Sequence, residues 1–109
     1  GGYRRSGYHE TANWLFRNGI WERITFDELF KIDNARYQKV VLDAIRQKQD
    51  MPAVCLDCST IFEQNNRFTF HENGIKLYFF EGEPHAFQII LTREQLEEIP
   101  SAKWIVPFL

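Results

Sequence analysis

The segment from Arg67 to Phe80 constrains the fold more than any other part of the chain. Two runs of alternating apolar and polar side chains flank Asn73-Gly74, the dipeptide that type I′ turns of β-hairpins favour. A two-residue turn at this point predicts that residue 72 pairs with 75, 70 with 77 and 68 with 79. The sequence therefore predicts a β-hairpin with a defined register.

The predicted register divides the hairpin into two faces of different character. The apolar face comprises Phe68, Phe70, Ile75, Leu77 and Phe79. The opposite, mixed face comprises Arg67, Thr69, His71, Lys76, Tyr78 and Phe80. An antiparallel sheet of this kind is covered on its apolar face only, so a second layer must pack there.

The segment 34–49 is the best candidate for that covering layer. Its apolar residues recur at helical spacing and fall on one face: Tyr37, Val40, Val41, Ala44 and Ile45. Asp33 is placed to cap the start of this helix, and Met51-Pro52 is a signal for its end. We expect this helix to lie on the hairpin.

Shorter elements surround these two. Thr25 with Glu28, and Thr92 with Gln95, form capping boxes that predict short helices, the second ending before Pro100. We expect a third strand over 85–91, extended pieces over 13–16 and 20–24 around Asn18-Gly19, and a last strand over 104–109. The predicted class is α+β: an antiparallel meander (hairpin 67–80 plus strand 85–91) on one main helix (34–49), with short capped helices.

Length and charge limit the function classes. The 109 residues fit one domain over 1–109, and the formal net charge of −2 argues against a dedicated nucleic-acid binder. No apolar run approaches the roughly 18 residues of a membrane-spanning helix. Gly1-Gly2 resembles a cleavage scar or the cut edge of a larger protein.

Cys55 and Cys58 form a CxxC motif that leaves several interpretations open. The first is a local disulfide, or two thiols without a role. The second is a zinc site, for which a second pair of ligands at metal spacing is missing from the sequence. The third is a thioredoxin-like site, which Asp57 disfavours because its carboxylate would raise the thiol pKa. We expect no metal or other cofactor.

No arrangement of residues in the sequence indicates catalysis, so we expect a binding domain. Aromatic residues make up 16% of the chain, and tryptophan and tyrosine dominate the energetics of protein interfaces. By default Trp14, Trp21 and Trp104 are expected in the core. The candidate binding residues lie instead on the mixed face of the hairpin: Tyr78, Phe80, His71 and Lys76.

Four segments, taken in order, resemble one bacterial envelope domain of unknown function. They are Ser6–His9, Ile24–Phe30, Phe68–Phe79 and His85–Leu96. That domain forms the extracellular part of RsiV-type lysozyme-sensing anti-sigma factors and recurs in PdaC-type peptidoglycan deacetylases. The resemblance implies a non-catalytic domain in the periplasm or outside the cell. It also implies that the chain is the C-terminal part of a longer exported protein, attached to a membrane only through upstream segments.

The same resemblance suggests the partner: lysozyme, another envelope protein, or peptidoglycan. Two other hypotheses remain open. The first is a small cytoplasmic interaction or immunity-type inhibitor protein, which a mildly acidic α+β chain also suits. The second is a zinc or thiol-redox module that uses Cys55 and Cys58.

Overall fold

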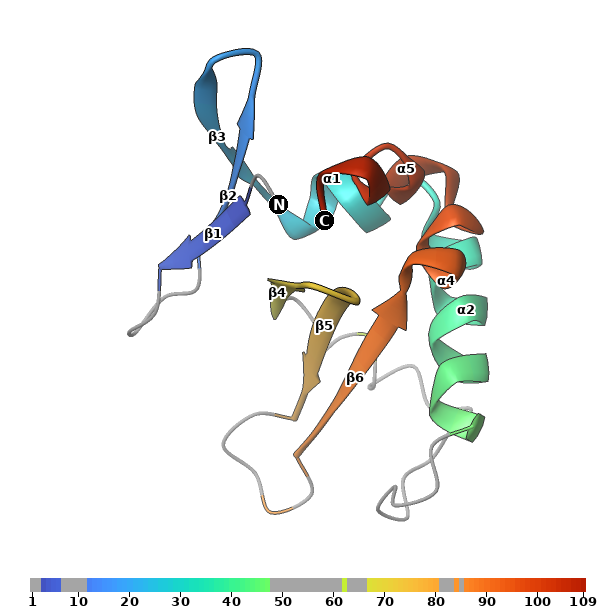
Figure 1. The fold of residues 1–109 in the computed structure, drawn as a ribbon. Helices are drawn as coiled ribbons and strands as arrows, with labels where there is room; N and C mark the ends of the chain where they lie inside the picture. The colour runs from blue at the N-terminus through green and yellow to red at the C-terminus, as the bar shows by residue number, and fades with distance from the viewer. Residues whose placement is uncertain (1–2, 7–11, 48–61, 63–66, 81–83, 85) are drawn as a thin grey trace.

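The computed structural model describes residues 3–6, 12–47, 62, 67–80, 84 and 86–109, and its fold is α+β (Figure 1). Two three-stranded antiparallel sheets follow the chain order. The first contains β1 (Tyr3–Ser6), β2 (Ala12–Arg17) and β3 (Ile20–Ile24), and the second β4 (Arg67–His71), β5 (Gly74–Phe79) and β6 (Phe87–Thr92). The helices are α1 (Phe26–Phe30), α2 (Asn34–Gln47), α4 (Arg93–Glu97), α5 (Pro100–Lys103) and the 3-10 turn η1 (Val106–Phe108).

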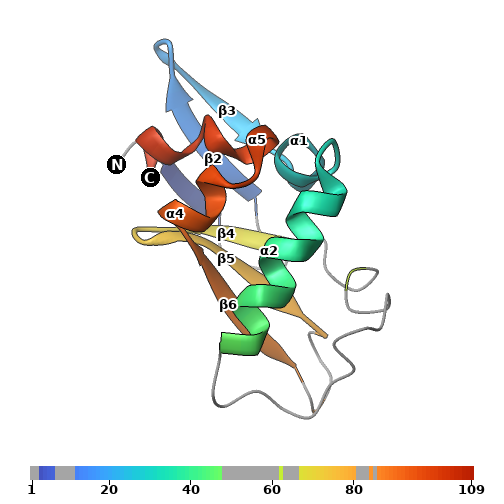
Figure 2. The same cartoon turned by 90° about the vertical axis from the view of Figure 1, so that its right-hand side faces the viewer.

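Helix α2 crosses one face of the β4-β5-β6 sheet, as predicted for the covering layer (Figure 2). Its buried residues are Tyr37, Val40, Val41 and Ile45. The predicted apolar face of the hairpin is confirmed, since all five of its residues are buried in the same cluster: Phe68, Phe70, Ile75, Leu77 and Phe79. Phe87, Ile89 and Leu91 of β6 extend this cluster across the sheet.

The hairpin register differs from the prediction, although its faces do not. His71 pairs with Gly74 and Phe68 with Leu77, so Glu72 and Asn73 form the loop. Each pairing moves by two residues, and an even shift keeps every side chain on its face. A Cβ at Gly74 would lie 1.8 Å from the Leu91 carbonyl oxygen, so this glycine is required by the approach of β6, not by the turn.

The type I′ signal belongs to the other Asn-Gly pair in the chain. Asn18 and Gly19 both have positive φ, 56° and 82°, and they join β2 to β3 at the pairing of Arg17 with Ile20. Positive φ at both central residues defines a type I′ turn. The extended pieces expected over 13–16 and 20–24 are therefore the strands of a true hairpin, with β1 added on the far side of β2.

Both predicted capping boxes are present, at Thr25 with Glu28 and at Thr92 with Gln95. The cap predicted at Asp33 has a different target: its carboxylate accepts a hydrogen bond from the backbone N–H of Ser101, 2.7 Å away at the start of α5. The side-chain hydroxyl of Ser101 in turn donates to the Leu29 carbonyl. Asp33 thus ties the C-terminal helices to α1.

The C-terminal segment is helical where a strand was expected over 104–109. Pro100 does not only end α4 but occupies the first turn of α5, where its missing N–H costs nothing. Ile99, Ala102 and Ile105 then enter the core at helical spacing. The apolar composition of this segment is typical of a strand, but its buried residues recur every three positions, as in a helix.

The buried side chain of Asn13 connects the two sheets through hydrogen bonds. The Asn13 side-chain amide donates to the Phe68 carbonyl at 2.8 Å, and its Oδ1 accepts from the Phe70 N–H at 3.3 Å. The carboxamide takes the place of a neighbouring strand on the outer edge of β4. No helix in the described part of the chain is long and apolar enough to cross a membrane.

Candidate functional site

Strand β6 is the far edge of its sheet, and its hydrogen-bonding pattern follows from that of β4. Asn13 bonds the Phe68 carbonyl and the Phe70 N–H, so these groups point away from β5. Backbone groups alternate in direction along antiparallel strands, so the groups of Ile75, Leu77 and Phe79 point toward β6. Their partners are Leu91, Ile89 and Phe87. The backbone N–H and C=O groups of Gln88 and Ile90 therefore point outward, beyond the sheet.

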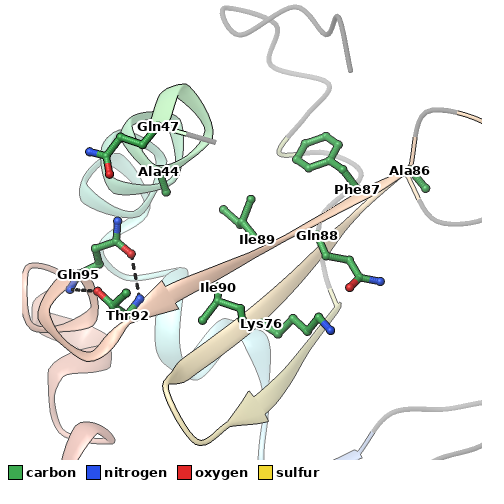
Figure 3. A pocket seen from close by; sticks show the side chains of 10 residues that line it. All are labelled: Ala44, Gln47, Lys76, Ala86, Phe87, Gln88, Ile89, Ile90, Thr92 and Gln95. Carbon is green, nitrogen blue, oxygen red and sulfur yellow. Dashed lines mark hydrogen bonds between the residues drawn. The ribbon is translucent and has the colours of Figure 1, made fainter. Parts of the chain in front are cut away.

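An open groove of about 660 Å³ lies along this edge (Figure 3). Ala44 and Gln47 of α2 form one wall, and β6 contributes residues from both of its faces. Phe87 and Ile89 lie on the side of α2, and Gln88 and Ile90 on the opposite side (Figure 3). Among the described lining residues, Lys76 carries the only charge.

The capping box of α4 closes one end of the groove. The Thr92 N–H, the next outward-pointing donor of β6, bonds the Gln95 side-chain oxygen at 2.8 Å (Figure 3). The Gln95 N–H bonds the Thr92 hydroxyl at 3.2 Å in return. The outward donor at the end of the strand is thus satisfied internally, and those of Gln88 and Ile90 face the groove.

The structure brings two of the predicted binding residues together, but it covers one of them. The Tyr78 ring is only 9% exposed. Its faces are covered by the Arg67 guanidinium, 4.7 Å from the ring centroid, and the Lys76 ammonium, at 5.8 Å. The Tyr78 hydroxyl lies 3.1 Å from the Thr69 hydroxyl. Tyr78 therefore positions Lys76 at the groove instead of offering a free aromatic surface.

The other two predicted binding residues lie apart from the groove. Phe80 was expected on the mixed face, but its φ of 55° takes it out of the strand alternation. Its ring packs against the core, 6.2 Å from that of Phe87. His71 is half-buried, and its Nδ1 accepts a hydrogen bond from the Asn73 N–H at 3.1 Å. His71 thus braces the hairpin loop.

The tryptophans are less buried than expected for core residues. Trp14 and Trp104 are half-buried, and Trp21 is exposed on β3 beside Phe16, with 5.3 Å between ring centroids. The Arg17 guanidinium lies 4.7 Å from the Trp104 ring centroid. Aromatic side chains therefore lie on the surface of the first sheet as well as in the core.

The CxxC lies outside the described residues, so the structure does not place Cys55 or Cys58. Within the described residues there is no group of three or more histidine, cysteine, aspartate or glutamate side chains that could hold a metal ion. The disulfide, zinc and thiol-redox hypotheses remain predictions for that motif.

Sequence reasoning did not identify the β6 edge as a site. The available signal was the alternation from Phe87 to Thr92 in the last strand of a meander, since a last strand without a partner is an edge. Comparisons with models of known protein families, with curated proteins and with solved structures find no match to this chain. The resemblance to the envelope domain therefore stays a hypothesis that rests on its four segments.

Proposed function

We propose that this chain is a non-catalytic binding domain that receives an extended segment of a partner protein as an added strand along β6. The observation that carries the proposal is the outward-pointing backbone of Gln88 and Ile90 inside a groove of about 660 Å³. Strand addition uses such backbone groups for affinity and the neighbouring side-chain pockets for specificity.

The lining indicates which segment would fit. An added strand points alternate side chains to the two faces of the sheet. On the side of α2 they would meet Ala44 and Ile89, which favours small apolar residues. On the other side they would meet Gln88 and Lys76, which favours a polar or acidic residue. The preferred partner segment therefore alternates apolar and polar residues, with an acidic residue near Lys76.

For the partner and location, the proposal follows the resemblance: an envelope protein such as lysozyme, or peptidoglycan, in the periplasm or outside the cell. Charge supports a basic partner. Residues 25–109 contain nine lysines and arginines against thirteen aspartates and glutamates, a formal charge of −4. Such a charge speeds the approach of a strongly basic protein, although it does not define the contact.

The groove is tested with a library of linear peptides displayed on phage and panned against the domain. The enriched peptides are then measured against Ile90→Pro and Ile90→Thr. The Ile90 N–H points away from β5, so proline there removes the outward donor without removing a bond of the sheet. Threonine also removes the exposed apolar side chain but keeps the donor. We expect at least a tenfold weaker binding to Ile90→Pro and near wild-type binding to Ile90→Thr.

Two results would contradict the proposal: no enriched peptides, or equal binding to wild type and Ile90→Pro. Lysozyme is tested separately, by calorimetric titration of the wild-type domain and of Ile90→Pro. Peptide binding without lysozyme binding rejects the proposed partner and keeps the groove. Lysozyme binding that Ile90→Pro leaves unchanged assigns lysozyme to another surface.

A further inference from the structure

Charge is distributed unevenly between the strands and the rest of the molecule. The described strands contain six basic residues: Arg4, Arg5, Arg17, Arg23, Arg67 and Lys76. Their only acidic residue is Glu22, which forms an ion pair with Arg17. The whole chain nevertheless has a formal net charge of −2. The described strands are therefore rich in basic residues, although the protein as a whole is acidic.

Part of this charge lies on the outer faces of the two sheets. In the first sheet, Arg23 pairs with Trp14, whereas the alternate residues Asn13, Leu15 and Ile24 are buried. In the second sheet, Arg67 and Lys76 lie beside Tyr78 on the face away from the core. Arg23 and Arg67 line one small cavity of about 200 Å³, so these two arginines of different sheets lie near each other.

The tip of the β2–β3 hairpin adds exposed apolar side chains to this cationic surface. Phe16, Ile20 and Trp21 are 46%, 57% and 41% exposed. In both views the hairpin extends beyond the rest of the molecule (Figures 1 and 2). The tip therefore presents three large apolar side chains at the far end of the fold.

The register places Arg23 directly behind this tip. Phe16 pairs with Trp21 next to the turn, and two residues further along the strands Trp14 pairs with Arg23. Two residues of a strand span about 7 Å. Proteins that bind the membrane interface use this arrangement. Their apolar groups enter the boundary between lipid headgroups and acyl chains by about 5–10 Å, and basic residues behind them contact the headgroups.

We propose that the outer face of the first sheet, led by the β2–β3 tip and backed by Arg23 and Arg67, docks on an anionic phospholipid surface. The position of Ile20 favours a lipid surface over a flat protein partner. It lies on the opposite face of the hairpin from Phe16 and Trp21, and only a medium that surrounds the tip contacts both faces.

This surface does not depend on the β6 groove, and it differs from membrane attachment through upstream segments. Outside the groove, two cations, Arg23 and Arg67, lie on this surface. At the usual contribution of a cation near an anionic membrane, the two favour anionic over neutral vesicles by roughly thirtyfold. The attraction weakens as salt is raised.

The test is flotation of the whole domain with two kinds of vesicle, phosphatidylcholine alone and phosphatidylcholine with a third of phosphatidylglycerol. We expect flotation with the anionic vesicles only. Arg23→Glu, at an exposed position, reverses one charge and should weaken binding by about thirtyfold. Ile20→Ser and Trp21→Ser should each weaken binding as well, because they remove apolar side chains from the tip. The matched controls are Lys39→Glu on exposed α2 surface and Ile32→Ser at a site that is 83% exposed, and both should bind as wild type.

The folded state of each variant is checked by circular dichroism. If Trp21→Ser does not fold, Ile20→Ser and Arg23→Glu decide the outcome. The proposal is overturned by a lack of flotation with anionic vesicles, or by Arg23→Glu and Ile20→Ser floating as well as their controls. It is also overturned if an oligonucleotide or an acidic polypeptide binds the same residues more tightly than the vesicles do.

Discussion

Replacement of Asn13 by leucine should weaken the connection between the two sheets. The Asn13 side chain is 2% exposed and satisfies two backbone groups of β4, at 2.8 Å and 3.3 Å. Leucine has a similar size but no polar atoms, so both groups lose their partner. A buried backbone group without a partner costs about 1–3 kcal/mol, so the pair costs about 2–6 kcal/mol. This is a large part of the usual 5–15 kcal/mol stability of a domain.

The assay is equilibrium unfolding in urea, combined with amide exchange of the Phe70 N–H. We expect a loss of at least 2 kcal/mol, within the range estimated above, and faster exchange at Phe70. The control is Gln38→Leu, at a half-exposed amide on α2, which should change stability by less than about 0.5 kcal/mol. A loss below about 1 kcal/mol for Asn13→Leu would mean that water reaches the β4 edge. The joint between the sheets would then lie elsewhere.

Three further predictions concern the scaffold. Gly74→Ala should destabilise the domain by about 1–3 kcal/mol or more in urea unfolding, because the new Cβ would lie 1.8 Å from the Leu91 carbonyl oxygen. Gly19→Ala should cost only about 1 kcal/mol, from the strain of its positive φ. Equal effects of the two substitutions would contradict this prediction. Burial raises the pKa of the Tyr37 phenol, so above about pH 10 Tyr37 ionises in the unfolded state but not in the folded state. The free energy of unfolding should therefore fall by up to about 1.4 kcal/mol per pH unit, and Tyr37→Phe should remove this contribution. Parallel pH profiles of the two proteins would refute this prediction. Thr92→Ala should cost about 1 kcal/mol in thermal unfolding through loss of the α4 cap, and a neutral result would mean that α4 is held by packing alone.

Face assignments were the part of the fold that the sequence predicted best. The alternation from Phe68 to Phe79 fixes which side chains are buried, whatever the register. The two capping boxes likewise fix where α1 and α4 begin, because each box uses neighbouring residues only. Local patterns of this kind do not depend on the rest of the molecule.

Long-range partners could not be predicted in the same way. The choice between the two Asn-Gly pairs depends on β6, whose carbonyl at Leu91 leaves no room for a Cβ at Gly74. Asp33 looks like a cap for α2, but its partner is 68 residues further along the chain. The sequence near each residue has no information about such partners.

The candidate site depends on this long-range arrangement as well. Lys76 was correctly placed on the mixed face, but its position at a groove follows from the order of the strands and from the position of α2. Phe80 was placed on the wrong face because a positive φ for phenylalanine has no local signal. The site could be found only once the edge of β6 was known.

The central claim is that no strand of the described residues covers the outer edge of β6, and amide exchange along β6 tests it most directly. The measurement is hydrogen–deuterium exchange of the free domain, followed residue by residue by NMR. The account predicts alternation, with fast exchange at Gln88 and Ile90 and slow exchange at Phe87, Ile89 and Leu91. Uniformly slow exchange along the whole strand would contradict it, because the edge would then already be covered.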